Sequence, residues 1–107
     1  MSIIEARYGH IYRLCLDQDV TVLGIIVSND RLNALYDEYI TAQVATSKEH
    51  DGTAGAVRLN PGDPAFGYII CRDIGMVLQE ELKEDLGPVS LETRVEMEQA
   101  LRRVLGP

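Results

Sequence analysis

Apolar residues recur at every second position over several short stretches of the chain, and this spacing predicts β-strands. The predicted strands cover residues 7–16, 20–27, 39–46, 55–59 and 67–77. The second of them, Val20–Val27, is rich in β-branched residues and contains Gly24, which we expect at a bulge or a close approach of two strands. Turn-forming residues such as Asp17-Gln18-Asp19 separate the strands. The pattern therefore indicates a mainly β protein.

Three helices are predicted where the alternation stops. Ser28, Asn29 and Asp30 are all good N-cap residues, so a short helix should follow and run through Tyr36. Residues 78–86 carry leucines at i, i+4 and i+8 and end at Gly87, which predicts a second short helix. Ser90 should cap the last helix, whose apolar face is expected to hold Met97, Ala100, Leu101, Val104 and Leu105. Short strands followed by terminal helices favour a small, partly open barrel with appended helices. Its core is expected to include Leu14, Leu16, Ile25, Val27, Ile40, Val44, Ile69 and Leu101.

Length, charge and cysteine content narrow the class of protein. With 107 residues, the chain is expected to form a single domain spanning 1–107. The net charge of −7 argues against nucleic-acid binding unless basic residues gather on one face. No apolar run reaches the length of a membrane span, and the first residues lack a signal-peptide pattern, so we expect a cytoplasmic protein that does not bind membranes. Cys15 and Cys71 lie in apolar strand patterns and are interpreted as free buried thiols.

Few residues suggest chemistry when they are considered without any family. Thr46-Ser47-Lys48-Glu49-His50 places hydroxyls, a cation and an imidazole directly after a strand, although many exposed hairpin loops have such a composition. Arg72 and Asp73 are neighbours within an apolar strand and must therefore point to opposite faces. Arg13 also lies among apolar strand residues. On their own, these features indicate no more than a small β-barrel domain.

A series of short motifs nevertheless resembles the MazF/PemK/Kid toxins of type II toxin–antitoxin systems. The motifs are, in chain order, R-Y-G-H-I-Y-R-L-C-L-D, V-L-G-I-I-V-S-N-D, A-T-S, T-A-G-A-V-R-L, G-P-V-S-L-E and A-L-R-R-V-L-G. Together they cover nearly the whole chain with compatible spacing. The resemblance implies an SH3-like barrel with C-terminal helices, a homodimer, and a cognate antitoxin whose disordered tail wraps the toxin. It also implies cleavage of single-stranded RNA without metal or cofactor, and it leaves open whether operator DNA is bound together with the antitoxin.

The chain departs from the family pattern where that pattern carries its phosphate-facing arginine. The positions that match the family's Arg-Pro pair are Val22 and Leu23, and Asp73 stands where the family has glutamine. The family's Thr-Ser pair is kept as Thr46 and Ser47. Loss of one phosphate-stabilising donor costs about a hundred- to a thousandfold in rate.

Two hypotheses follow from this departure. In the first, the protein is an RNA-cleaving toxin with a rearranged site. Its predicted catalytic residues are Arg72, Thr46 and Ser47, and its predicted RNA-binding residues are Arg13, Lys48 and Arg58, with Arg13 the alternative source of the cation. In the second, it is a catalytically inactive homologue that acts as a dimeric partner- or nucleic-acid-binding module. The related gyrase-poisoning branch is disfavoured, because the chain ends in L-G-P and lacks that branch's aromatic-glycine-isoleucine tail.

Overall fold

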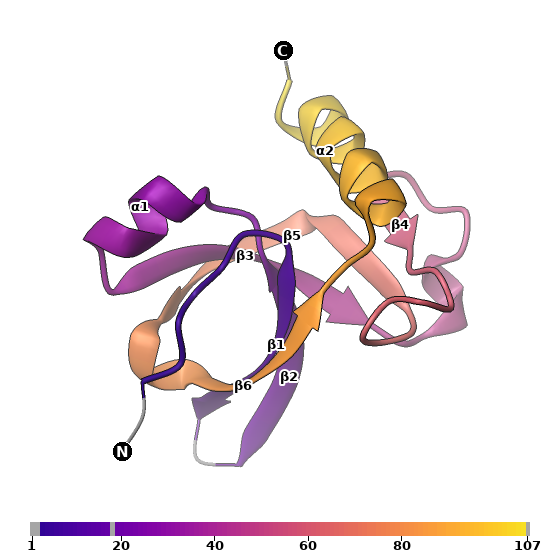
Figure 1. Ribbon diagram of the computed structural model, residues 1–107. Helices are drawn as coiled ribbons and strands as arrows, with labels where there is room; N and C mark the ends of the chain where they lie inside the picture. Colours follow the sequence, from indigo (N-terminus) through magenta and orange to yellow (C-terminus); the bar gives the residue numbers. More distant parts are fainter. Residues whose placement is uncertain (1–2, 18, 107) are drawn as a thin grey trace.

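One antiparallel sheet of six strands forms most of the protein (Figure 1). The computed structural model describes residues 3–17 and 19–106. The strands are β1 (His10–Asp17), β2 (Val20–Ile26), β3 (Glu38–Ala45), β4 (Ala56–Arg58), β5 (Tyr68–Leu78) and β6 (Leu82–Pro88). Their order across the sheet is β4-β5-β3-β2-β1-β6. The helical segments are α1 (Asp30–Leu35), η1 (Lys48–His50), η2 (Gln79–Glu81) and α2 (Leu91–Leu105). The mainly β, SH3-like architecture predicted from the sequence is confirmed.

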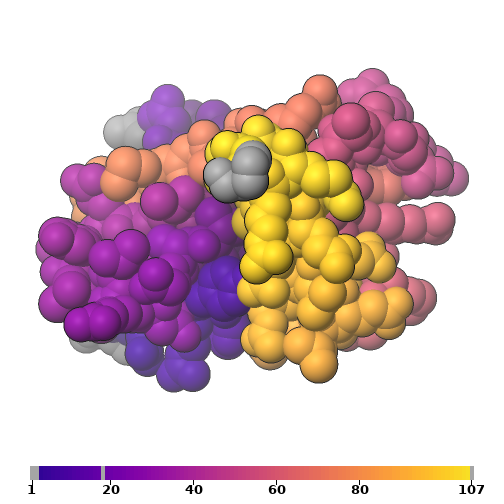
Figure 2. All heavy atoms as spheres, turned by 90° about the horizontal axis from the view of Figure 1, so that it is seen from above, coloured from indigo at the N-terminus to yellow at the C-terminus, as the bar shows by residue number. Residues whose placement is uncertain are grey.

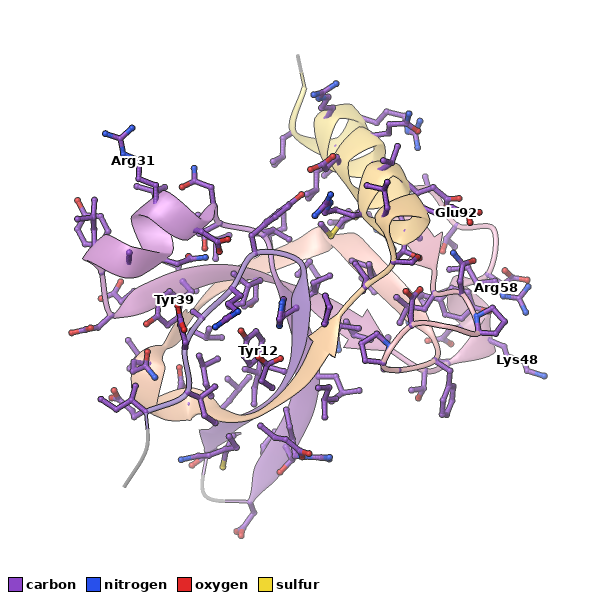
Figure 3. The ribbon with its side chains drawn as sticks, in the orientation of Figure 1. Tyr12, Arg31, Tyr39, Lys48, Arg58 and Glu92 are labelled. Carbon is purple, nitrogen blue, oxygen red and sulfur yellow. The ribbon has the colours of Figure 1, made fainter. Side chains whose placement is uncertain are left out.

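The connection between β5 and β6 forces the sheet to curl. β5 lies next to one edge of the sheet and β6 forms the other edge, yet only the short η2 turn joins them. The sheet must therefore bend round so that its two sides approach, which produces a partly open barrel. Tyr12 and Tyr39 both project into it and belong to its inner core (Figure 3). The buried Tyr12 hydroxyl is satisfied, because it donates to the Glu5 carbonyl at 2.8 Å.

A second core lies on the other face of the sheet, under α2. Met97 and Ala100 of α2 are buried there against strand residues such as Ile25 and Ile69. Seen from above, α2 forms a ridge beside the region of α1 and leaves α1 uncovered (Figure 2). Ser90 caps α2 as predicted, since its side chain accepts a hydrogen bond from the Thr93 amide. The predicted cap of the first helix is also observed, with Asn29 accepting from the Leu32 amide.

The predicted helix over residues 78–86 is wrong. Leu78 ends β5, and the residues after it form the η2 turn and then β6, in which Leu82 pairs with Leu14 and Glu84 pairs with Arg13. The leucine spacing fits a helix locally, but β1 would then keep an unpaired edge. Pairing of β6 with β1 satisfies those backbone groups and buries Leu82 in the inner core. Tertiary hydrogen bonding therefore overrides a weak helical preference.

The predicted core is correct in its centre and wrong at its margins. Leu14, Ile25, Val44 and Ile69 are buried, and Val27 and Leu101 pack at the edge of the second core. Leu16 and Ile40 are exposed, as are Val104 and Leu105 at the end of α2, because no described element covers those positions. Gly24 lies at the expected close approach, since a Cβ there would be 2.8 Å from Leu14 Cδ1. Both cysteines are free, with Cys71 buried and Cys15 partly exposed. Among the described residues, no helix is long and apolar enough to cross a membrane.

Asp63 ties the turn after β4 to the first turn of α2. Its carboxylate accepts hydrogen bonds from Thr93 Oγ1 at 2.6 Å, from the Asn60 amide at 2.7 Å and from the Ser90 amide at 2.7 Å. Burial works against ionisation, but these hydrogen bonds outweigh it and hold the pKa of Asp63 below its usual value. From the sequence alone, Asp63 is recognisable only as an aspartate in a turn.

Asp63→Ala is expected to lower the free energy of unfolding at neutral pH by about 2–3 kcal/mol, because several hydrogen bonds to one charged group are lost. The folded-state pKa lies below the unfolded one, so the contribution is present above the unfolded pKa and is lost as pH falls through the folded pKa. Urea titrations at pH 7 and below pH 4 should therefore show the difference between parent and variant shrinking in acid. Glu96→Gln, an exposed carboxylate on α2, is the control. A difference independent of pH would contradict this account.

Candidate functional site

The predicted residues Arg13, Thr46 and Ser47 line one shallow groove with a volume of about 410 Å³. Arg13 comes from β1, Thr46 and Ser47 directly follow β3, and β2 supplies the floor between them. We call this the hydroxyl groove; its lining is completed by Thr21, Val22, Leu23, Gln43, Val44 and Ala45. Antiparallel pairing explains the grouping, because Leu23 lies opposite Val44 and Arg13 lies opposite Leu23.

The backbone around Thr46 and Ser47 is held in place from both sides. Ser47 is the N-cap of η1, and its side chain accepts a hydrogen bond from the Glu49 amide at 3.4 Å. On the opposite side, Gly67 has a φ of +125° and packs directly against Ala45 and Thr46. Both hydroxyl-bearing residues are exposed, so their hydroxyls can donate to a bound anion.

Arg13 supplies the positive charge of the groove. Among the described residues that line it, Arg13 alone is charged. Its Nε donates to Glu84 Oε1 at 2.9 Å, and its Nη2 lies 2.9 Å from the same oxygen. The pair is half exposed, so the attraction is partly screened by water. Glu84 therefore orients the guanidinium but leaves part of its hydrogen-bonding capacity free.

Val22 lies in the hydroxyl groove, as its place in the sequence pattern suggested. Its side chain packs at the margin of the inner core. An aliphatic side chain cannot stabilise phosphate charge, so any cation at this groove has to come from another position.

A second hollow of about 210 Å³ continues from the hydroxyl groove. The two share Val22, Leu23 and Gln43, and we call the continuation the apolar hollow. Its walls are mostly aliphatic, and Asp73 enters from β5. Gln43 joins both parts of the site and was not singled out from the sequence. Its only signal was a polar residue in an alternating strand, which normally indicates a solvent-facing position.

Arg72 does not line the hydroxyl groove. It lies with Arg103 of α2 in a separate cleft of about 460 Å³. The reason is a register shift in β5: Gln43 pairs with Ile70, while Ala42 pairs with Ile74. The intervening residues direct Cys71 into the core and separate Arg72 from Asp73. Burial raises the pKa of the Cys71 thiol to about 11, although the nearby charge of Arg103 acts in the opposite direction.

The two other predicted RNA-binding residues, Lys48 and Arg58, lie outside the hydroxyl groove. Lys48 begins η1 and Arg58 ends β4, and both are exposed. Figure 3 shows them on the same side of the molecule, the side that carries the edge strand β4. They could contact a chain that extends past the groove, but they do not contribute to its lining.

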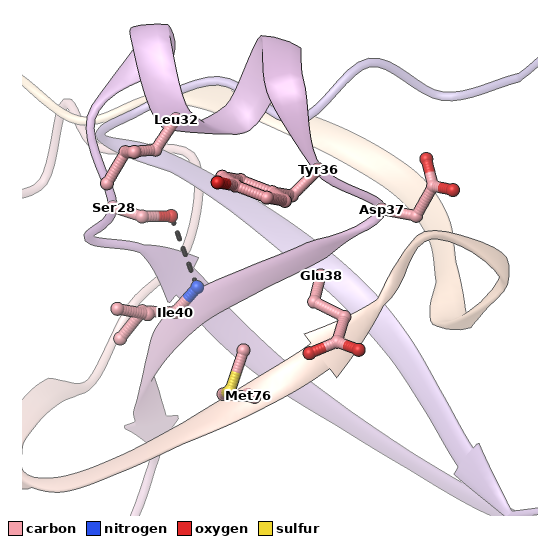
Figure 4. Close-up of a pocket in the computed structure, with 7 residues that line it drawn as sticks. All are labelled: Ser28, Leu32, Tyr36, Asp37, Glu38, Ile40 and Met76. Carbon is pink, nitrogen blue, oxygen red and sulfur yellow. Dashed lines mark hydrogen bonds between the residues drawn. The ribbon is translucent and has the colours of Figure 1, made fainter.

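An apolar groove lies at the opposite end of β3, between α1 and the sheet (Figure 4). Its volume is about 500 Å³, and its apolar lining consists of Leu32, Tyr36, Ile40 and Met76. All four side chains are substantially exposed. The rim carries Asp37 and Glu38, and the hydroxyl of Ser28 is buried and already hydrogen-bonded, since it donates to Asn33 Oδ1 and accepts from the Ile40 amide. This lining favours a contact surface over a catalytic site.

The chain matches known proteins in structure, whereas the sequence comparisons find no match. No protein-family model matches the chain, and a search of curated sequences finds no relative. A mycobacterial endoribonuclease in complex with its cognate antitoxin superimposes with a TM-score of 0.86 and 27% identity, covering 94% of each chain. A mycobacterial endoribonuclease superimposes with a TM-score of 0.86 and 26% identity, covering 97% of this chain and 94% of the other.

The MazE–MazF complex from Deinococcus radiodurans has the same fold. Its TM-score is 0.81 over 99% of this chain and 98% of the other, and at 15% identity it shows the shared fold. The chain is therefore structurally similar to MazF-type toxins. It shares the six-stranded sheet and the terminal helix of these neighbours. Its own hydroxyl groove combines Val22 with an ion-paired Arg13.

Proposed function

We propose that this MazF-like protein is the toxin component of a toxin–antitoxin system and that it cleaves single-stranded RNA in the cytoplasm. The observation that carries the proposal is the hydroxyl groove, where Arg13, Thr46 and Ser47 converge on one surface. Solved structures with 26–27% identity, described as endoribonucleases, support the same activity.

The proposed reaction is an internal transfer of a phosphodiester. The ribose 2′-oxygen forms a bond to phosphorus and loses its proton, while the bond to the 5′-oxygen breaks and that oxygen gains a proton. The products are a 2′,3′-cyclic phosphate and a 5′-hydroxyl end, and no metal or cofactor takes part. Arg13 would stabilise the charge that grows on the phosphate, and the hydroxyls of Thr46 and Ser47 would donate to its non-bridging oxygens.

The test is cleavage of a long unstructured RNA with EDTA present. We expect slow, metal-independent cleavage that leaves 2′,3′-cyclic phosphate ends and spares duplex RNA. Slow cleavage is expected because Glu84 competes with phosphate for Arg13 and because Val22 offers no donor. Absence of cleavage by the pure protein, together with normal growth of cells that express it, would contradict the proposal.

The same two features favour one second candidate function. A chain that has Val22 in the groove and an arginine held by Glu84 could keep the fold only as a dimeric binding module. In that case the protein would bind its partners without any RNA cleavage. The EDTA assay therefore separates the two functions.

We also propose an antitoxin as the partner of this chain. Support comes from the mycobacterial endoribonuclease solved with its cognate antitoxin and from the MazE–MazF complexes. The chain has a net charge of −7, so the antitoxin segment that contacts it should be less acidic than usual, or basic. A gene neighbourhood with no small adjacent reading frame would count against this partner.

The protein is further expected to be a homodimer. The exposed apolar groove formed by Leu32, Tyr36, Ile40 and Met76 is the kind of surface that a second copy covers. Sedimentation at micromolar concentration should give twice the chain mass of 11.9 kDa. Tyr36→Glu should shift the equilibrium toward monomer. Arg58→Gln, which changes the net charge by the same amount at another exposed position, should not. A parent protein that sediments as a monomer would contradict the expectation.

A further inference from the structure

We infer that the apolar hollow beside the hydroxyl groove binds an unpaired guanine base and that Asp73 selects it. This inference rests on the proposed RNA-cleaving function and deepens it by naming the base that is recognised. The two parts of the site are continuous through Val22, Leu23 and Gln43, so one short piece of RNA can occupy both.

The shape of the hollow suits a flat, partly apolar ligand. Leu23, Met76 and Val77 contribute aliphatic surface, and few polar groups converge on it. Gly75 adds room, because a Cβ at that position would meet nothing within 4 Å. Leu16 also lines the hollow and is 46% exposed, so a stacked base would remove apolar surface from water.

The charges of the site set the direction in which RNA lies. Arg13 lies on β1 in the hydroxyl groove, Asp73 lies on β5 in the hollow, and β2 and β3 separate the two strands in the sheet. A carboxylate repels phosphate, whereas it accepts hydrogen bonds from the amino and imino groups of bases. The phosphate therefore belongs near Arg13 and the base near Asp73.

Asp73 is available to bind a ligand. Within residues 3–17 and 19–106, its exposed carboxylate takes part in no ion pair or side-chain hydrogen bond. A free carboxylate on the rim of an apolar hollow has acceptors only. It will favour the base that presents the most donors side by side.

Guanine meets that requirement best. Its N1–H and N2–H₂ groups are adjacent and parallel, so they can form two hydrogen bonds with the two oxygens of one carboxylate. Adenine and cytosine each present one amino group next to an acceptor nitrogen, and uracil presents one N–H between two carbonyls. The side-chain amide of Gln43, on the shared wall, can donate to guanine O6.

Binding of uncleavable oligonucleotides tests the inference. The probes are fluorescent 2′-O-methyl pentamers of uridine whose central base is guanine, hypoxanthine, adenine or uracil; the methyl group blocks the attacking oxygen. We expect guanine to bind at least about tenfold more tightly than hypoxanthine, which lacks only the 2-amino group, because one hydrogen bond to a charged acceptor is lost. Asp73→Asn should reduce this preference to below about threefold, and Glu96→Gln, with the same change in charge, should keep it.

The possible outcomes separate this inference from the proposed function. Equal binding of guanine and hypoxanthine by the parent protein would overturn the guanine site while cleavage of long RNA still stood. Guanine preference without cleavage would support the site and contradict the nuclease. If the Asp73→Asn variant still prefers guanine, Asp73 does not select the base and that part of the inference is wrong. The comparison with hypoxanthine uses the parent protein alone, so it decides the matter even if the variant does not fold.

Discussion

Gly67→Ala is expected to destabilise the protein by about 3 kcal/mol or more, through backbone strain and overpacking together. Gly67 has a φ of +125°, which L-residues rarely adopt. The new Cβ would overlap the carbonyl oxygen of Ala45 and would lie 3.2 Å from Thr46 Cα. These are backbone atoms of β3 and of the groove, so they cannot rotate away as a side chain would. Urea titration should show a large fall in the unfolding midpoint.

Gly62→Ala is the matched control for Gly67→Ala. It also lies in the segment between β4 and β5, but its φ is not positive and an added Cβ would meet nothing within 4 Å. Its effect should stay within about 0.5 kcal/mol. If Gly67→Ala and Gly62→Ala had the same midpoint, the close packing of Gly67 against the end of β3 would be wrong. If Gly67→Ala still folds at low temperature, it should lose RNA cleavage, because Thr46 and Ser47 are displaced.

Arg13→Ala is expected to lower kcat/KM for RNA cleavage by about a hundredfold, the typical cost of one transition-state donor. Arg13 is the charged residue among the described lining of the hydroxyl groove, whereas Arg72 lies in the cleft with Arg103. Arg72→Ala is therefore the matched control, since it removes the same charge from an exposed strand position and should change kcat/KM by less than about threefold. This expectation reverses the sequence-based choice of Arg72 as the leading cation.

Glu84→Gln provides an independent test of the same arrangement. Both guanidinium contacts of Arg13 go to Glu84 Oε1, so removal of the carboxylate charge should free Arg13 for phosphate. Cleavage should then become a few times faster at low salt, and the gain should diminish as salt screens the groove. A large loss on Arg72→Ala, with no loss on Arg13→Ala, would return the catalytic role to Arg72.

Much of the candidate site was accessible from short-range patterns. Thr46 and Ser47 follow an alternating strand and precede a polar loop, and Arg13 interrupts an apolar one, so each could be singled out before the fold was known. Their common groove follows from the pairing of β1 with β2, which a short turn joins, and of β2 with β3, which are connected through α1. Gln43 was missed, because a polar residue in an alternating strand usually faces only water.

Local chemistry along the chain specified the strands β1 to β5 and the caps of α1 and α2, because each depends mainly on neighbouring residues. Long-range pairing specified the rest. The leucine spacing of 78–86 fits a helix, but β6 instead pairs with β1. Arg72 lies outside the hydroxyl groove because β5 shifts register between Ile70 and Ile74. Backbone hydrogen bonds between distant strands stabilise the fold more than a weak local preference does. The residues next to each strand do not indicate where those hydrogen bonds will form.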